Sequence, residues 1–303
     1  MRYPDVERLA ADQSGVISRR QLYSLGLTRW QVKAQLRAGR WRSHGRQTIA
    51  VHTGTLDQSA LWWRAVWEVG ADAALDGVSA LQAAGLRGFE APVLQVSVSR
   101  GSRYRKLPGV RVYETRRRKP DDVLGHGLPR VRPEIAAVRA ALWAVTNRQA
   151  ALLWLMPIQQ RIFGAEALSE AFSSVKRHRR RAFLRTVLAD LVNGVQSMGE
   201  LDFARMCRAR GLPEPTRQVV RRGPNGRIYL DVYWDQWGIV VEIEGAQHLD
   251  PGMAISDALR QNHLFVHGDG VLRIPVIGLR LEPDAFMNQV ARLLARCRRA
   301  AAA

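Results

Sequence analysis

Three carboxylates gather at the end of a β-hairpin that the sequence predicts in the last third of this 303-residue chain. Residues 228–234 (IYLDVYW) alternate like a strand, residues 235–238 (DQWG) suit a turn, and residues 239–245 (IVVEIEG) continue as a second strand. Because side chains alternate across a strand, Glu242 and Glu244 share one face, and Asp231 lies within reach on the partner strand. We call Asp231, Glu242 and Glu244 the carboxylate cluster.

The carboxylate cluster favours metal chemistry, because neighbouring carboxylates repel one another unless a cation or a proton intervenes. Hard divalent cations that take oxygen ligands, Mg²⁺ or Mn²⁺, are the usual occupants of such sites. The alternative is that Glu242 and Glu244 form the solvated face of an edge strand, and the alternation fits both interpretations equally.

A chain of this length holds two or three domains, each with its own core. No apolar stretch reaches the length of a membrane span, and the first residues lack the apolar core of a signal peptide. The two cysteines, Cys207 and Cys297, give neither a disulfide framework nor the spacing of zinc ligands. We therefore expect a cytoplasmic protein with reduced thiols and no membrane partner.

The net charge of +19 is distributed unevenly along the chain. Residues 1–52 carry +7 and residues 53–196 carry +10, whereas residues 197–290, which hold the predicted hairpin, carry −2. A basic surface of this kind attracts polyanions, and nucleic acid is the usual one. The alternative is a solvated basic surface without a partner.

Residues 4–52 have the pattern of a winged helix-turn-helix. Helices are predicted at 5–12, 19–25 and 29–38, with Ser18 and Thr28 as N-caps, followed by a β-wing at residues 41–51. We call residues 41–51 the wing. In such folds the second helix of the pair enters the major groove of DNA. The same fold also serves as a protein-interaction module.

This interpretation assigns DNA contacts to residues 29–46. Side chains near the start of the third helix are expected to meet bases or phosphates, and those of the wing region the DNA backbone. Trp30 and Leu36 are expected in the core. The predicted DNA-binding residues are Arg29, Gln31, Lys33, Arg40, Arg42 and Arg46.

The sequence pattern in the middle of the chain predicts an α/β region followed by helices. Helices at 56–69 and 78–84 precede strands at 93–99 and 110–114, which we expect to form a hairpin around the basic turn 100–106. Arg103, Arg105 and Lys106 in that turn are candidate phosphate contacts, although a solvated turn has the same pattern. The tryptophans at 62, 63 and 67 have helical spacing and are expected in the core. Four further helices are predicted at 133–144, 148–160, 165–174 and 179–193, without chemistry of their own.

The first 130 or so residues resemble the antitoxin of AbiE-type bacterial toxin–antitoxin systems, the AbiEi family. The motifs that carry this resemblance are LDGVSALQAAGL, LQVSVSRGSR and GVRVYETRR, placed after the winged helix. The resemblance implies double-stranded DNA binding by residues 15–51, used in that family for autoregulation. It leaves a toxin partner open and does not by itself imply neutralisation of a toxin.

The C-terminal region predicts a helix at 198–210, strands at 217–222, 228–234 and 239–245, a helix at 254–266, a strand at 271–276 and a helix at 283–299. This αβββαβα order is the core topology of the PD-(D/E)xK nuclease superfamily. The segments SMGELDFARMCRARGLPEPTRQVV, GRIYLDVYW, VVEIEGAQH and DALRQNHLF resemble the Vsr-like endonuclease domain family over residues 197–295.

The resemblance implies roles for individual residues. Asp231 and Glu242 match metal-binding acids, Glu244 the second acid of the E-x-[DE]-G pattern, Glu200 a helical glutamate, and His248 a histidine after the strand. Asp257 and Arg260 match a D-x-x-R element, with Arg260 a phosphate contact, although an intrahelical ion pair explains them equally well. One or two Mg²⁺ ions would polarise the scissile phosphate, with Glu244 or His248 placing the attacking water.

The chain departs from the superfamily in one respect, since residues 197–303 contain no lysine. Either His248 replaces the missing base, or the fold has kept its acids without full activity. We therefore carry two hypotheses, a DNA-binding, Mg²⁺- or Mn²⁺-dependent deoxyribonuclease and a non-catalytic AbiEi-like repressor with a degenerate nuclease fold. A pure protein-interaction scaffold ranks third because it leaves the charge unexplained.

The expected fold class is a multidomain α+β or α/β chain with four parts. These are a winged helix-turn-helix (1–52), an AbiEi-like α/β domain (53–130), a helical connector (131–196) and a PD-(D/E)xK-like domain (197–303).

Overall fold

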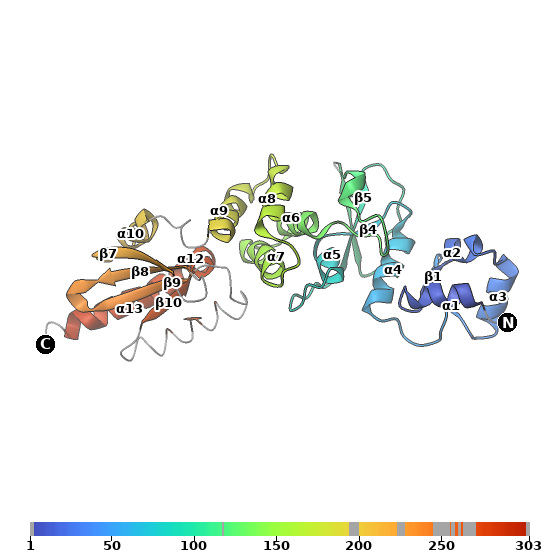
Figure 1. Cartoon of the computed structure of the whole chain (residues 1–303), viewed down its shortest axis with the longest axis horizontal. Helices are drawn as coiled ribbons and strands as arrows, with labels where there is room; N and C mark the ends of the chain where they lie inside the picture. The colour runs from blue at the N-terminus through green and yellow to red at the C-terminus, as the bar shows by residue number, and fades with distance from the viewer. Residues whose placement is uncertain are drawn as a thin grey trace. The chain divides into compact units, whose positions relative to one another are not determined.

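The computed structural model of the chain describes residues 3–116, 118–193, 200–222, 228–244, 255, 258–259, 262 and 271–300. It divides into two compact units, Met1–Ala140 and Ala141–Ala303 (Figure 1). Within these described ranges the protein is a mixed α/β structure with three small sheets. No helix in the described part is long and apolar enough to cross a membrane.

The first unit begins with three helices and a small antiparallel sheet, in the strand order β1-β3-β2. The three predicted helices are confirmed, and residues 41–51 contain the paired strands β2 and β3, while β1, which pairs with β3, was not expected. Ser18 and Thr28 each close a capping box at the start of their helix. The elements are α1 (Pro4–Ala11), β1 (Val16–Ser18), α2 (Arg19–Ser24), α3 (Arg29–Arg37), β2 (Arg42–Ser43) and β3 (Thr48–Ala50).

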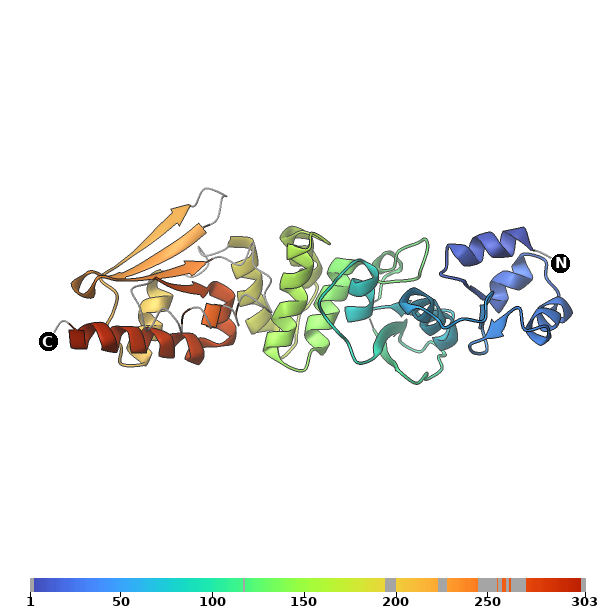
Figure 2. The same ribbon diagram turned by 90° about the horizontal axis from the view of Figure 1, so that it is seen from below.

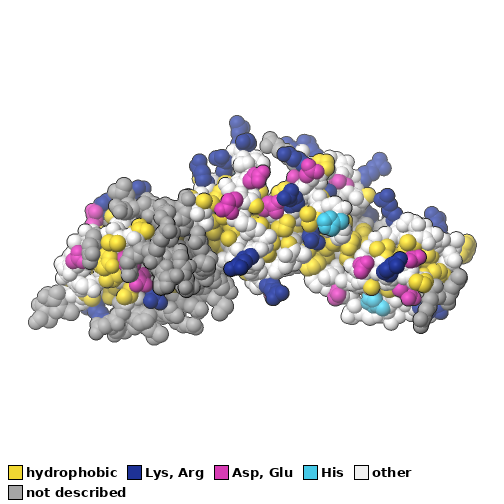
Figure 3. Space-filling model, viewed as in Figure 1, with side chains coloured by type: hydrophobic (Ala, Val, Ile, Leu, Met, Phe, Trp, Pro, Cys, Tyr) yellow, Lys and Arg dark blue, Asp and Glu magenta, His cyan; other side chains and the backbone are white. Residues whose placement is uncertain are grey.

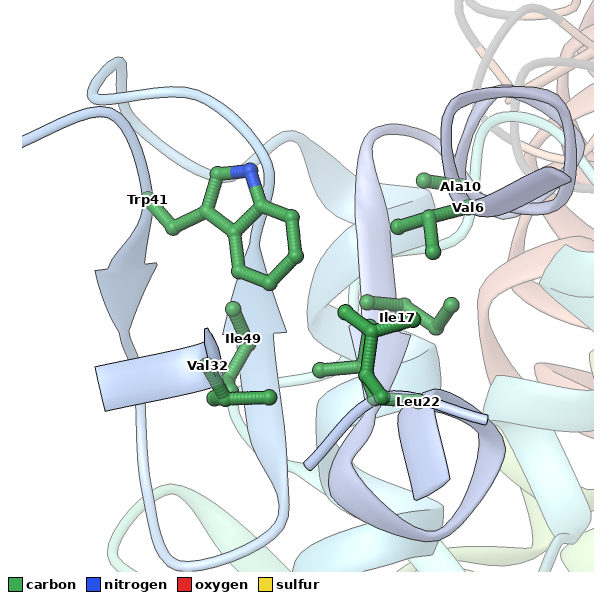
Figure 4. Close-up of a cluster of buried hydrophobic side chains, with 8 residues drawn as sticks. Val6, Ala10, Ile17, Leu22, Val32, Trp41 and Ile49 are labelled. Carbon is green, nitrogen blue, oxygen red and sulfur yellow. The ribbon is translucent and has the colours of Figure 1, made fainter. Parts of the chain in front are cut away.

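A single apolar cluster holds these elements together (Figure 4). It joins α1, β1, α2, α3 and the wing through the buried residues Val6, Ala10, Ile17, Leu22, Leu27, Val32, Trp41 and Ile49. Leu36 packs against it as expected. The expectation for Trp30 is wrong, since this side chain is 75% exposed. Val32 is a fully buried residue of α3, and residues two apart on a helix lie about 200° apart around its axis, so Trp30 points away from the core.

The remainder of the first unit forms a second three-stranded sheet, in the order β4-β5-β6, against helices. Trp63 is buried and its ring centroid lies 5.0 Å from that of Trp67. The elements are α4 (Gln58–Val69), β4 (Ala74–Leu75), α5 (Gly77–Ala83), β5 (Leu94–Ser99), β6 (Val110–Thr115), a 3-10 turn (Pro120–Asp122) and α6 (Pro133–Trp143), which crosses the boundary between the units.

The expected hairpin between β5 and β6 is wrong, because the two strands run parallel. Leu94 pairs with Val110, so the connection at residues 100–109 must return along the whole length of β5 before β6 begins. Its middle is held where α4 ends, by a hydrogen bond of 2.8 Å from Arg105 N to Val69 O. The candidate phosphate contacts of this segment therefore lie on a crossover, not on a hairpin tip.

The second unit combines helices with a four-stranded sheet in the order β10-β9-β8-β7. The predicted strands at 217–222 and 228–234 are confirmed, whereas most of the predicted helix at 254–266 lies outside the described residues. The elements are α7 (Asn147–Gln159), α8 (Ala165–Ser173), α9 (Arg181–Asn193), α10 (Glu200–Ala209), β7 (Arg217–Arg222), β8 (Ile228–Trp234), a 3-10 turn (Asp235–Trp237), β9 (Ile239–Glu244), β10 (Leu272–Pro275), α12 (Val276–Leu281) and α13 (Pro283–Ala300).

The four-stranded sheet has one apolar face. Strands β7, β8 and β9 are antiparallel, and β10 joins β9 in parallel. Helices α10 and α13 lie on the same side of the sheet (Figure 2). On α10, Phe203 packs edge-on against Trp234 at 6.3 Å between ring centroids. The apolar face is thus covered by helices, and the alternation along β8 and β9 places Asp231 and Glu242 on the opposite face.

Arg180 is a structural residue of the second unit. Its side chain belongs to the basic block at 176–181, yet it is only 6% exposed. It donates hydrogen bonds to the carbonyl oxygens of Leu142 and Val145, and to Asn147 Oδ1. The guanidinium therefore joins the end of α6 to the start of α7.

Candidate functional site

Helix α3 presents a row of cations to solvent. Arg29, Lys33 and Arg37 are four residues apart, so they lie along one side of the helix, and all three are exposed. We call them the α3 basic row. Trp30 stands beside it, with Lys33 Nζ 5.5 Å from the centroid of the tryptophan ring. The exposed side of α3 thus combines three positive charges with one large aromatic surface.

The start of α3 is fixed by Thr28 and Gln31. Gln31 Oε1 accepts hydrogen bonds from Thr28 N (2.8 Å) and Thr28 Oγ1 (2.9 Å), while Gln31 N donates to Thr28 Oγ1 (3.3 Å). This reciprocal cap satisfies backbone groups that a helix start otherwise leaves unpaired. Gln31, predicted as a DNA contact, has its carbonyl oxygen in the cap and lies outside the α3 basic row.

Three further predicted DNA-binding residues, Arg40, Arg42 and Arg46, are exposed in or beside the wing. Arg40 Nε donates to Gln35 Oε1 at 2.6 Å, which ties its side chain to α3. Arg19 Nε donates to the carbonyl oxygen of Arg46 at 2.9 Å, which ties the wing to the start of α2. The wing and the helix pair are therefore connected by polar contacts as well as by the core.

The wing is also bound by α4, through Glu68. Glu68 is 3% exposed, and its carboxylate accepts hydrogen bonds from the backbone N–H groups of Arg46 (2.9 Å), Gln47 (2.7 Å) and Thr48 (2.8 Å). It also accepts one from the Thr48 hydroxyl at 3.0 Å. No role for Glu68 was predicted from the sequence. The signal was a lone acid inside the apolar run AVWEV, where a charge must find partners.

The hydrogen bonds to Glu68 determine the direction in which its pKa is shifted. Burial alone raises the pKa of the Glu68 carboxyl, but the hydrogen bonds from the wing backbone and from the Thr48 hydroxyl outweigh burial and lower the pKa below its ordinary value. Arg105 Nη1 lies 3.3 Å from Glu68 Oε2. The carboxylate is therefore ionised and held among donors at neutral pH.

The other predicted phosphate contacts differ in their surroundings. Arg103 and Lys106 are exposed on the crossover at residues 100–109, whereas Arg105 is partly engaged by Glu68. Arg260 lies outside the described residues. Lys and Arg side chains project from the face of the molecule shown in Figure 3 over both units.

Two members of the carboxylate cluster face each other in the second unit. Asp231 is fully buried and its Cα is paired with that of Glu242, which places both side chains on one face about 5 Å apart at Cβ. Tyr233 Oη donates to Asp231 Oδ2 at 3.1 Å. Glu244 follows on the same face and is half-buried.

An arginine side chain lies beside Asp231 and Glu242. Arg273, on the neighbouring strand β10, is paired in register with Glu242, and its Nε lies 3.2 Å from Glu242 Oε2. The side chain of Glu242 is 18% exposed and that of Arg273 is 61% exposed. A positive charge from the adjacent strand thus neutralises part of the cluster.

Carboxylate oxygens are suitable donors for Mg²⁺ or Mn²⁺, so the chemistry of Asp231 and Glu242 fits a hard cation. Among the residues that the structure describes, however, no group of three or more His, Cys, Asp or Glu is placed to hold a metal ion. His248 and Asp257 lie outside the described residues, and of Glu200 only the backbone, in α10, is described. The structure brings together two acids and an arginine.

Comparisons with known proteins give little further information. No family model matches the chain, and no curated protein matches it. One similar solved structure is the crystal structure of RV2827C protein from Mycobacterium tuberculosis, with a TM-score of 0.37 and 17% sequence identity. The similarity covers 64% of this chain and 76% of that chain. A likeness this remote transfers no function to this chain.

Proposed function

We propose that this protein binds double-stranded DNA, with α3 in the major groove and the wing on the adjacent backbone. The observation that carries the proposal is the α3 basic row, three exposed cations on one side of α3, which we interpret as the second helix of a helix-turn-helix pair. The major groove admits an α-helix, and no compensating acid is present in α3. The +7 charge of residues 1–52 agrees with a polyanionic partner.

The side chains of α3 suit both kinds of DNA contact. Arginine and lysine pair with guanine O6 and N7 or with phosphate oxygens, and an apolar surface contacts the thymine methyl group. Trp30, at 75% exposure, offers such a surface at the start of the helix. Arg42 and Arg46 in the wing are placed for phosphates, which set the position of the helix without reading sequence.

The test is duplex binding by the full-length protein, measured by fluorescence anisotropy at low salt. The variant Arg29→Ala/Lys33→Ala/Arg37→Ala is expected to lose most of its affinity. The matched control removes three exposed arginines of α13, in Arg292→Ala/Arg296→Ala/Arg299→Ala, and is expected to bind like the wild type. An equal loss in both variants would show that total charge, and not α3, determines binding.

A second function, phosphodiester hydrolysis in the second unit, is favoured by one specific observation. Fully buried Asp231 lies opposite Glu242 on adjacent antiparallel strands, with a third acid, Glu244, on the same face. The strand arrangement is compatible with the Vsr-like, PD-(D/E)xK interpretation. In this proposal Asp231 and Glu242 would hold Mg²⁺ or Mn²⁺, which supplies Lewis-acid polarisation of the phosphate when bound.

In such a site, Tyr233 and Arg273 would position the two acids. The Tyr233 hydroxyl orients Asp231 by its hydrogen bond, and Arg273 holds Glu242 in place and offers a cation to a phosphate oxygen. Arg273 thereby supplies positive charge in a region without lysine. An arginine does not act as a base at neutral pH, so it stabilises charge and does not replace a catalytic lysine.

Calorimetric titration of Mn²⁺ separates the two interpretations of the second unit. Binding to the wild type that is absent in Asp231→Asn, together with metal-dependent nicking of plasmid DNA, supports the nuclease. DNA binding without metal binding and without nicking supports the repressor, for which the AbiEi resemblance leaves a toxin partner open. Nicking that persists in both Asp231→Asn and Glu242→Gln would remove the carboxylate cluster from the proposal.

A further inference from the structure

The wing is held by one face of α4 through complementary backbone contacts. Arg64 and Glu68 lie four residues apart on this helix, hence on one side of it. Arg64 Nε donates to the carbonyl oxygen of His44 at 2.7 Å, before the wing turn. The Glu68 carboxylate accepts hydrogen bonds from the three backbone N–H groups of residues 46–48, after the turn. A cation thus binds the carbonyl side of the turn and an anion its amide side.

The contact requires a glycine in the turn. A Cβ atom added at Gly45 would overlap the Glu68 carboxylate. The backbone can lie this close to the carboxylate because residue 45 has no side chain. Gly45 in the turn of the wing thus permits the close approach of an acid from another helix. The lowered pKa of the Glu68 carboxyl agrees with a charge satisfied by fixed donors.

We propose that Glu68 is a positioning residue of the DNA interface, which holds the wing so that Arg42 and Arg46 meet the DNA backbone beside α3. This inference rests on the proposed DNA binding. Glu68 is 3% exposed and its carboxylate is bound by four donors of the wing, so it acts through the wing and not by touching DNA.

Two physical effects oppose each other when Glu68 is neutralised, and this makes the proposal testable. Removal of a negative charge near a polyanion strengthens binding, because long-range repulsion is lost. Loss of wing position weakens binding, because the phosphate contacts of Arg42 and Arg46 are lost. The sign of the change therefore identifies which effect dominates.

The experiment measures duplex affinity of the full-length protein against salt concentration for the wild type, Glu68→Gln and the control Glu90→Gln. Glu90 is an exposed acid of the same unit, outside the wing and α4. We expect Glu68→Gln to bind more weakly and its log–log salt slope to become less steep by about two, one phosphate contact for each wing arginine. Glu90→Gln should bind as tightly as the wild type or slightly more tightly. Affinity in Glu68→Gln that matches or exceeds that of Glu90→Gln would overturn the proposal.

A double-mutant cycle excludes a merely structural role. In the Glu68→Gln background, Arg46→Ala should cause little further loss, because the wing has already moved, whereas Arg29→Ala on α3 should cause its full loss. Equal additivity for both arginines would contradict positioning. If Glu68→Gln does not fold, Gly45→Ala displaces the wing while the Glu68 charge remains, and the same pattern of coupling is expected.

Hydrogen exchange of the wing amides distinguishes failure of this inference from failure of the proposed function. The amides of Gln47 and Thr48 should be protected in the wild type and exchange faster in Glu68→Gln, with or without DNA. Faster exchange with unchanged DNA affinity would refute the positioning role alone. A folded wild type that binds no duplex at low salt would refute the proposed function itself.

Discussion

Raising the salt concentration from about 50 to 200 mM should weaken duplex binding by roughly 1,000-fold, if α3 and the wing together neutralise six phosphates. The estimate comes from six exposed cations of this surface, which are Arg29, Lys33, Arg37, Arg40, Arg42 and Arg46. Each phosphate neutralised contributes about −0.9 to the slope of log affinity against log salt, which gives a slope of about −5.

The triple variant Arg29→Ala/Lys33→Ala/Arg37→Ala removes half of these charges. Its slope should be about −3, and the same change in salt should cost it only about 40-fold in affinity. The assay is fluorescence anisotropy of a labelled duplex at five or more salt concentrations. The α13 triple variant at positions 292, 296 and 299 serves as the charge-matched control and should keep the wild-type slope.

Two results would refute this reasoning. A wild-type slope shallower than about −2 would mean that most of the six cations contact no phosphate. An unchanged slope in the α3 triple variant, with the loss appearing in the α13 control, would place the DNA on a different surface.

Three further predictions concern stability and recognition. Trp30→Ala should change the free energy of unfolding by less than about 0.5 kcal/mol because the ring is 75% exposed, yet lower duplex affinity; denaturant titration and anisotropy measure the two effects separately. Glu68→Gln should destabilise the first unit by about 2–4 kcal/mol at pH 7, since several charge-assisted hydrogen bonds are lost. Because the pKa of Glu68 is lowered on folding, its stabilisation is present above the ordinary glutamate range and is lost as pH falls through the lowered pKa. Urea titrations of the wild type and the variant should therefore converge once the pH is below that lowered pKa. Arg180→Met should cost roughly 2–4 kcal/mol in the second unit, because two carbonyl oxygens and Asn147 lose a buried donor; an unchanged denaturation midpoint would contradict that role.

Local pattern was sufficient to predict much of the fold. Capping residues before apolar repeats located α2 and α3. Alternation located β8 and an apolar run located β9, with Asp231 expected near the acids of β9. These features depend on residues close in sequence, where propensity and periodicity act directly.

Long-range contacts determine the features that local pattern does not predict. The direction of β6 depends on where the crossover at 100–109 is anchored, and that anchor is a backbone contact to Val69. The amides that bind Glu68 lie 20 to 22 residues earlier in the chain, so the local pattern around Glu68 indicated a buried acid but not its partners. Trp30 was misplaced because hydrophobicity alone does not tell which side of a short helix faces the core.

The wing contact also bears on how this protein can be divided or recombined. A fragment that ends at residue 52 keeps α1, α2, α3 and the wing but loses α4, so the amides of residues 46–48 lose the Glu68 carboxylate that binds them. A fragment that carries the proposed DNA-binding surface therefore has to include α4 (Gln58–Val69) as well. Replacement of either Gly45 or Glu68 alone would disturb this contact, so a chimaeric protein has to take both residues from this chain.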